Sequence, residues 1–285
     1  MKLAYHGGTS MKSDLVTDVT VSDRAGYGAL EVWGAKVDSY LVDHTQADLA
    51  ALFTRHKVTP TAWNSIEFIG FRGDEYPAIR KRCKEMCTLA ERIGCRVLGV
   101  VPSPTPQASA GSVGELFYPW EKVVQEYVSV LRDLSDIAQP HGVKLAFEFL
   151  GFAWCSVRTP RGAKEIIDQV ARANVGINVD TCHFYGGGGE VSELDLLDPD
   201  SICTFHLNDM ESIPKEAMID SRRLLPGLGV IPLDSICSHM KGIGYDGQCA
   251  VELFRPEYWA WDPYELAVKA RQASLKVLER YFTMQ

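Results

Sequence analysis

Short runs of apolar residues recur eight times along the chain, and a segment with helical periodicity follows each of them. Continuous runs, rather than a strict alternation of apolar and polar positions, are typical of strands that are buried on both faces. The runs predict strands at residues 3–6, 29–34, 58–64, 95–100, 143–149, 175–180, 202–209 and 248–254.

The segments between these runs predict helices. The clearest spans residues 119–142, where Pro119 suits the first turn and Pro140 with Gly142 ends the helix. Similar patterns occupy residues 75–93, 160–173, 232–243 and 262–281. In the clearest helix one face is apolar and carries Val123, Tyr127, Val130, Leu131, Leu134 and Ile137.

Eight strand–helix repeats are the pattern of a (β/α)₈ barrel, the TIM barrel. An open doubly wound sheet is the alternative, but no G-x-G-x-x-G sequence follows the first predicted strand. No break in composition indicates a second domain. We therefore predict an α/β protein that is one TIM-barrel domain over residues 1–285.

Two connections are longer than the others, at residues 101–118 and 208–231. Both follow a predicted strand, so in a barrel both would lie on the face that carries the chemistry. Long connections of this kind are usually functional lids or else disordered segments.

The amino-acid composition makes some classes of binding partner less favourable. The formal net charge is -8, which disfavours binding to nucleic acid or to an anionic membrane surface. The sequence has no apolar run of membrane-spanning length and does not start like a signal peptide. The eight cysteines are scattered without a C-x-x-C pair, which predicts reduced thiols in a cytoplasmic protein. Whether the chain forms a homo-oligomer is left open.

Polar residues end four consecutive predicted strands. Glu148 ends the fifth strand, Asp180 the sixth, and Glu252 lies near the end of the eighth. His206 lies in the seventh, followed by Asn208 and Asp209. Because strand ends carry the chemistry in a barrel, these side chains are expected to converge.

Each of these residues also has a simple structural explanation. Glu148 could pair across strands, Asp180 could cap a turn, His206 could be a core histidine, and Glu252 could pair with Arg255. Their equivalent positions favour a joint role. Three buried carboxylates repel one another unless a cation binds them, and with an imidazole they suit manganese, magnesium or cobalt, with zinc also possible.

Three further residues lie near the predicted site. His183 follows Asp180 by three positions and could bond a loop carbonyl or orient a substrate and move protons. Arg222 and Arg223 precede the stretch "LLPGLGVIPL". One of these arginines could be a solvated surface charge while the other reaches a substrate oxygen.

Together these residues resemble the xylose-isomerase-like sugar isomerase and epimerase barrels, which hold one divalent metal through Glu, Asp, His and Glu. The resemblance covers essentially the whole chain. It is carried by "LSDIAQPHGVKLAFEFLGF", "NVGINVDTCHF", "FHLNDMESIP", "SRRLLPGLGVIPLD" and "VELFRPEYW". The last stretch is similar to the inosose-isomerase branch of this family.

The resemblance implies a site in which Glu148, Asp180, His206 and Glu252 hold one metal ion, most simply Mn²⁺. It implies that Glu148, Glu252 and His183 are catalytic. It also implies that the residues in contact with the substrate are Arg223, His183, Glu211 and Asn64. Two loops depart from the family pattern: the connection after the fourth strand is longer and rich in proline and serine, and "IDSRR" is more basic.

The activity implied is a metal-dependent isomerisation in inositol catabolism, in which a keto group moves between adjacent carbons of an inosose through an enediolate. The partner would be a small polyhydroxy ketone. Alternatives on the same scaffold are a ketose 3-epimerase and a lyase, such as a 3-dehydroshikimate-type dehydratase or a β-eliminating enzyme. A related DNA-repair endonuclease would need more histidines, and a sugar-binding protein would not need the complete ligand set.

Overall fold

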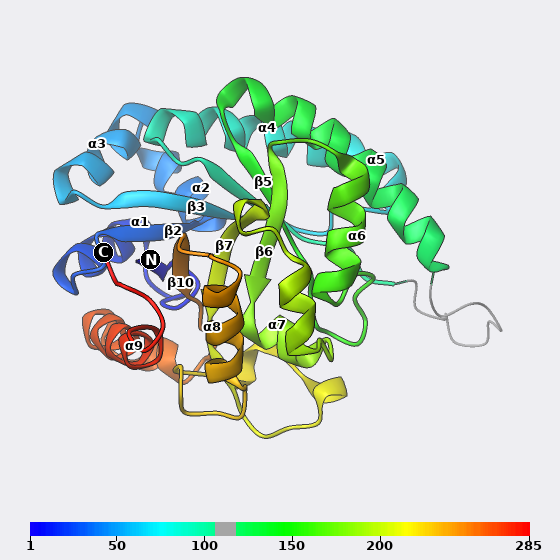
Figure 1. Ribbon diagram of the computed structural model, residues 1–285. Helices are drawn as coiled ribbons and strands as arrows, with labels where there is room; N and C mark the ends of the chain where they lie inside the picture. The colour runs from blue at the N-terminus through cyan, green and yellow to red at the C-terminus, as the bar shows by residue number, and fades with distance from the viewer. Residues whose placement is uncertain (106–117) are drawn as a thin grey trace, which may run out of the picture.

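The computed structural model describes residues 1–105 and 118–285. Its eight parallel strands close into a barrel in the order β1-β10-β7-β6-β5-β4-β3-β2. Figure 1 shows strands in the interior of the molecule with helices around them. The predicted TIM barrel is confirmed. The barrel strands are β1 (Lys2–His6), β2 (Ala29–Trp33), β3 (Thr59–Ile66), β4 (Val97–Val100), β5 (Lys144–Glu148), β6 (Val175–Asp180), β7 (Ile202–Leu207) and β10 (Gln248–Val251).

Helices surround the barrel, and the five that were placed by residue range all form. The helices are α1 (Leu15–Arg24), α2 (Gly34–Asp43), α3 (Gln46–His56), α4 (Tyr76–Ile93), α5 (Trp120–Ala138), α6 (Pro160–Val170), α7 (Thr181–Gly186), α8 (Leu233–Gly242) and α9 (Pro263–Leu278). Local sequence sets their ends. Thr159, for example, caps α6 through the amide of Gly162, while Gly94 ends α4 with a φ of 77°.

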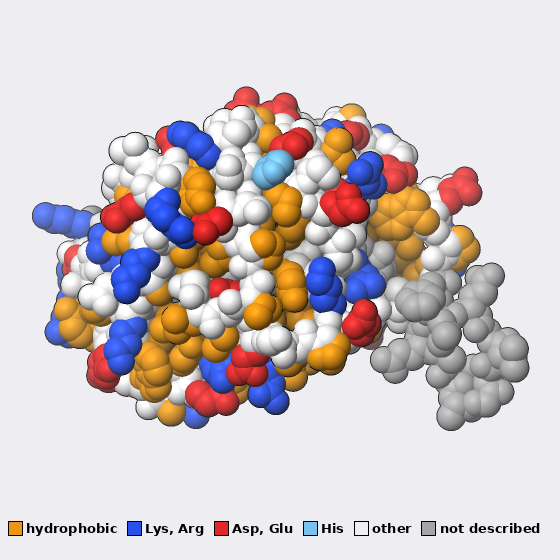
Figure 2. Space-filling model, turned by 60° about the horizontal axis from the view of Figure 1, so that its bottom comes forward, with side chains coloured by type: hydrophobic (Ala, Val, Ile, Leu, Met, Phe, Trp, Pro, Cys, Tyr) orange, Lys and Arg blue, Asp and Glu red, His pale blue; other side chains and the backbone are white. Residues whose placement is uncertain are grey.

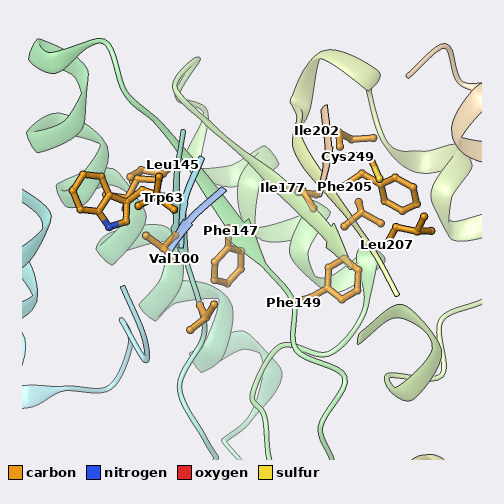
Figure 3. Packing of buried hydrophobic residues seen from close by; sticks show 14 of the residues in the cluster. Trp63, Val100, Leu145, Phe147, Phe149, Ile177, Ile202, Phe205, Leu207 and Cys249 are labelled. Atoms are coloured by element: carbon orange, nitrogen blue, oxygen red, sulfur yellow. The ribbon is translucent and has the colours of Figure 1, made fainter. Parts of the chain in front are cut away.

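Strand side chains alternate between the helix layer and the barrel interior. Leu145 and Phe147 of β5 belong to the large core cluster, part of which Figure 3 shows. Ala4, Ala29 and Ala250 form a separate small cluster. The residues two positions further along, His6, Glu31 and Glu252, therefore face the same side of the barrel wall as the three alanines.

The second long connection is folded. β7 ends at Leu207, and β8 (Asp209–Met210) pairs in an antiparallel manner with β9 (Arg223–Leu224). The Asp209 carboxylate accepts hydrogen bonds from the amides of Gly227, Gly229 and Ile231 at 2.8–3.0 Å. Asp209 is thus a loop anchor, and the connection carries Arg223 to the barrel end. Most of the first long connection, residues 106–117, lies outside the described residues.

All eight cysteines are free thiols, as predicted, and the Sγ atoms of Cys83 and Cys87 are 4.0 Å apart. None of the helices in the described part of the chain has the length and apolar character needed to cross a membrane.

A buried ion pair fastens the loop that follows β1. The Lys36 ammonium lies 2.7 Å from Asp18 Oδ2 and also donates to the carbonyls of Gly7 and Ser10 at 2.9 and 2.8 Å. The Ser10 hydroxyl donates to the other Asp18 oxygen at 2.7 Å. Lys36 therefore holds this loop to α1 at the rim of the barrel.

Replacing Lys36 by methionine is expected to lower the free energy of unfolding by about 3–5 kcal/mol, because Asp18 stays buried without its partner. Urea denaturation followed by circular dichroism measures this change. The double variant Lys36→Met/Asp18→Leu should recover much of the loss, and the exposed control Lys12→Met should change little. A Lys36→Met protein as stable as the wild type would contradict this account of the loop.

Candidate metal centre and pocket

The four residues expected at the strand ends lie together in the structure. Glu148 ends β5, Asp180 ends β6, His206 is in β7, and Glu252 directly follows β10. All four are buried, and each offers a ligand atom within 4.8 Å of those of the others. The cause is the barrel itself, since Asp180 and His206 are register partners on neighbouring strands.

His206 lies at the centre of this group. Its Nδ1 atom is 3.2 Å from Glu252 Oε2, 3.4 Å from Glu148 Oε1 and 3.9 Å from Asp180 Oδ2. Burial alone would lower the pKa of His206, but Glu31 and Glu252 raise it well above its ordinary value. In the absence of another cation the imidazole is therefore drawn toward its protonated form.

The two glutamates differ in their surroundings. Burial raises the pKa of Glu148. Burial acts in the same sense on Glu252, but His206, His6 and Arg223 together lower its pKa well below the usual range. Glu148 Oε1 is buried and accepts no hydrogen bond from any residue in the described ranges. An unpaired carboxylate oxygen beside two further carboxylates and an imidazole is a donor set that fits a divalent cation.

Arg223 supplies the fixed positive charge of the site. Its Nη1 donates to Asp180 Oδ2 at 2.8 Å and to Glu252 Oε2 at 2.7 Å, while Nε donates to Asp220 at 2.8 Å. The side chain is buried. Arg222, in contrast, is half exposed and pairs with Glu211 at 3.2 Å. Of the two arginines considered from the sequence, Arg223 is thus the one at the site.

His183 is held in one tautomer. Its backbone amide donates to Asp180 Oδ1 at 2.7 Å, so Asp180 also caps α7. Arg223 Nη2 lies 3.1 Å from His183 Nε2, and since a guanidinium can only donate, Nε2 is the acceptor. The proton is then on Nδ1, which is buried and has no partner among the described residues.

A cavity of about 550 Å³ opens beside these residues. Asn64, Glu148, His183 and Glu252 give it polar groups, and aromatic side chains form much of its wall. Figure 2, with the lower end of the molecule in Figure 1 turned forward, shows hydrophobic side chains exposed among the charged ones on this face. The aromatic residues of the wall are Trp33, Phe68, Phe152, Trp154, Phe254 and Trp259.

The residues expected to contact the substrate do not all line the cavity. Asn64 lines the cavity, with its Nδ2 3.5 Å from Glu252 Oε1. Glu211 does not line it and instead pairs with Arg255 at 2.6 Å as well as with Arg222. The alternative explanation of Glu252, a pair with Arg255, is not observed: Glu252 pairs with Arg223, and Arg255 pairs with Glu211.

Two buried residues of the site were missed from the sequence, His6 and Glu31. His6 Nε2 lies 3.1 Å from Glu252 Oε1, and both Glu31 oxygens lie 3.0 Å from His206 Nε2. Each belongs to an early apolar run, "LAYH" and "ALEVWG", so the signal that identified the four later residues was present here too.

Comparison with known proteins agrees with this geometry. Inosose isomerases from Halalkalibacterium halodurans and Bacillus subtilis are each 34% identical to the chain, over 288 and 287 residues, covering all of it and 99–100% of each relative. A crystal structure of the IolI protein with a bound zinc atom superposes with a TM-score of 0.94 at 34% identity, over the full length of both chains.

More distant structures share the fold. D-psicose 3-epimerase from Clostridium cellulolyticum H10 is 15% identical with a TM-score of 0.75, over 99% of both chains. A family model described as xylose isomerase-like TIM barrel matches residues 19–280. With the closed barrel and the four convergent side chains, this match shows that the chain belongs to the xylose isomerase-like TIM barrel family.

Proposed function

We propose that this protein is a metal-dependent inosose isomerase, which moves a keto group between adjacent ring carbons. The observation that carries the proposal is the convergent group of Glu148, Asp180, His206 and Glu252. Two of its members, Glu148 and Glu252, line the cavity. The full-length similarity to inosose isomerases supports the substrate class. The zinc atom in the similar IolI structure supports a requirement for a bound metal ion.

The isomerisation requires one proton to leave a hydroxyl-bearing carbon and one to reach the former carbonyl carbon. A hydroxyl proton also passes from one oxygen to the other, so the reaction is balanced without a co-reactant. Glu148 and Glu252 both line the cavity, so one carboxylate can remove the carbon-bound proton and the other can return it. A bound divalent cation would polarise the ketone and favour the enediolate.

His183 and Arg223 position the substrate oxygens in this proposal. The free Nδ1–H of His183 can donate to a hydroxyl or carbonyl oxygen, and its orientation is fixed by Arg223. Asn64 can hold a further hydroxyl. The aromatic walls exclude water from the reacting carbons and offer apolar surfaces to the C–H faces of a ring. For Glu211 the arginine pairs leave at most an indirect role.

We also propose Mn²⁺ as the physiological metal, inositol catabolism as the process, and the cytoplasm as the location. The oxygen-rich donor set supports Mn²⁺, although zinc and cobalt fit the same ligands. The eight free thiols support a reducing compartment. A homo-oligomer, if it forms, is detected by light scattering.

The reaction itself is tested by incubating the metal-loaded protein with 2-keto-myo-inositol in D₂O and following proton NMR. The expected product has the same composition, with deuterium at the former carbonyl carbon. Loss of water would identify a dehydratase instead. Turnover of ketohexoses at carbon 3, without turnover of the inosose, would identify an epimerase.

Glu148→Gln and Glu252→Gln should each lower kcat by about 10²- to 10⁴-fold, because each removes a carboxylate that transfers a carbon-bound proton. The same NMR assay measures this, with metal content checked by mass spectrometry so that metal loss is recognised. Glu85→Gln, an exposed residue of α4, is the control and should match the wild type. Full turnover in both active-site variants would exclude the assignment.

Chelation should abolish turnover and lower the melting temperature, because a ligand that binds only the folded state stabilises it, by about 2.7 kcal/mol at a hundred times its Kd. Adding back Mn²⁺, Co²⁺, Zn²⁺ and Mg²⁺ separately identifies the metals that restore both properties. Undiminished turnover by protein without detectable metal would contradict the metal-dependent reaction.

A further inference from the structure

Beside the four-residue site lies a second buried group that could in principle hold a metal ion, His6, Glu31 and His206. It is built by the barrel in the same way. His6 and Glu31 are register partners on β1 and β2, and Tyr5 is paired with Val251, so His6 stands level with Glu252 across the β1–β10 seam. The question is whether this group binds a second ion or positions a ligand of the first ion.

The hydrogen bonding of His6 argues against a second ion. The Gly8 amide donates to His6 Nδ1 at 3.0 Å, so that nitrogen is an acceptor and the ring proton of neutral His6 is on Nε2. Nε2 is the nitrogen that lies 3.1 Å from Glu252 and 3.7 Å from Glu31. A protonated nitrogen has no lone pair to offer a metal, so Nε2 of His6 is not a ligand atom, and it lies near the carboxylates without a hydrogen-bond partner among the described residues.

Glu31 has a direct relation to His206. Its two oxygens are both 3.0 Å from His206 Nε2, while Nδ1 of the same ring faces Glu148, Asp180 and Glu252. A carboxylate on Nε2 holds the proton there and leaves Nδ1 as the electron-pair donor. In metal sites such a partner fixes both the tautomer and the orientation of the ligating ring.

Besides Glu31 on Nε2 and the three carboxylates that face Nδ1, the Asn178 amide also lies close to the ring nitrogens. Its Nδ2 lies 3.2 Å from Nδ1 and 3.3 Å from Nε2 of His206. Near-equal distances to both nitrogens place the amide over the ring face, so it does not favour either tautomer. The selection is left to Glu31.

We propose that Glu31 is a positioning residue that holds His206 as an Nδ1 metal ligand, and that His6, Glu31 and His206 form an outer shell instead of a second metal site. The inference rests on the metal site of the proposed function, but not on the identity of the substrate. It gives residues of β1 and β2 a positioning role in a site whose metal ligands all come from the last four strands of the barrel.

The test measures metal binding, not activity. Equilibrium dialysis of metal-free protein against Zn²⁺ and Co²⁺ should give one ion per chain. Glu31→Leu should weaken binding about 10- to 100-fold, the range found when such partners are removed. Glu31→Gln keeps an acceptor oxygen for the Nε2–H and should lose less. The Co²⁺ absorption spectrum should change in Glu31→Leu and remain close to wild type in Glu31→Gln.

A matched control separates positioning from general destabilisation. Asp18→Asn alters another buried carboxylate, one paired with Lys36 and not with a ligand. It should lower the melting temperature but leave the metal affinity and the Co²⁺ spectrum unchanged. If Asp18→Asn weakens metal binding as much as Glu31→Leu, the effect of Glu31 is only structural and the proposal fails.

Nitrogen-15 NMR of the zinc-loaded wild type tests the geometry without any substitution. Expected are zinc on Nδ1 and a proton on Nε2 of His206, with a proton on Nε2 of His6. Zinc on Nε2 of His206, a proton on Nδ1 of His6, or two ions per chain would overturn the proposal. A wild type that binds no ion would overturn the proposed function as well, whereas unchanged affinity in Glu31→Leu would overturn only the role of Glu31.

Discussion

The crowding of buried carboxylates at one end of the barrel is the constraint on which the rest of the site depends. Moving an ionised carboxylate out of water costs several kcal/mol even after the protein relaxes. Here Glu148, Asp180 and Glu252 surround one imidazole. Arg223 offsets part of their charge, but it contacts two of the three and leaves Glu148 Oε1 without a hydrogen bond among the described residues. A dication removes this imbalance.

The barrel and its four central side chains were predictable because their signals are local. An apolar run that ends in a charged residue can be recognised within a few positions, and parallel strands bring such ends together. His6 and Glu31 are likewise polar residues within apolar runs, His6 at the end of the first strand and Glu31 in the middle of the second. They were missed because a linear chain places them far from the last strands, whereas closure of the barrel pairs β1 with β10.

Other contacts had no local signal. The approach of Arg223 depends on the pairing of β8 with β9, two strands of two residues each, which no periodicity could indicate. A pair of Glu252 with Arg255, its near neighbour in sequence, was the structural alternative considered for Glu252, but long-range geometry pairs Glu252 with Arg223 and Arg255 with Glu211. Ion pairing among buried groups is decided by which charges the fold brings together, not by their spacing along the chain.

The pairing of β1 with β10 has a consequence for the order in which the protein is synthesised, folds and binds its metal ion. It joins the beginning of the chain to its end, and the N-terminal ammonium adds bonds to Asp246 at 2.8 Å and to the carbonyl of Thr283 at 2.7 Å. Glu252 directly follows the last strand of this seam. A growing polypeptide therefore lacks the complete set of metal ligands until Glu252 has been synthesised. Unlike a zinc finger, whose metal drives folding, this barrel should assemble its scaffold first and capture its ion afterwards.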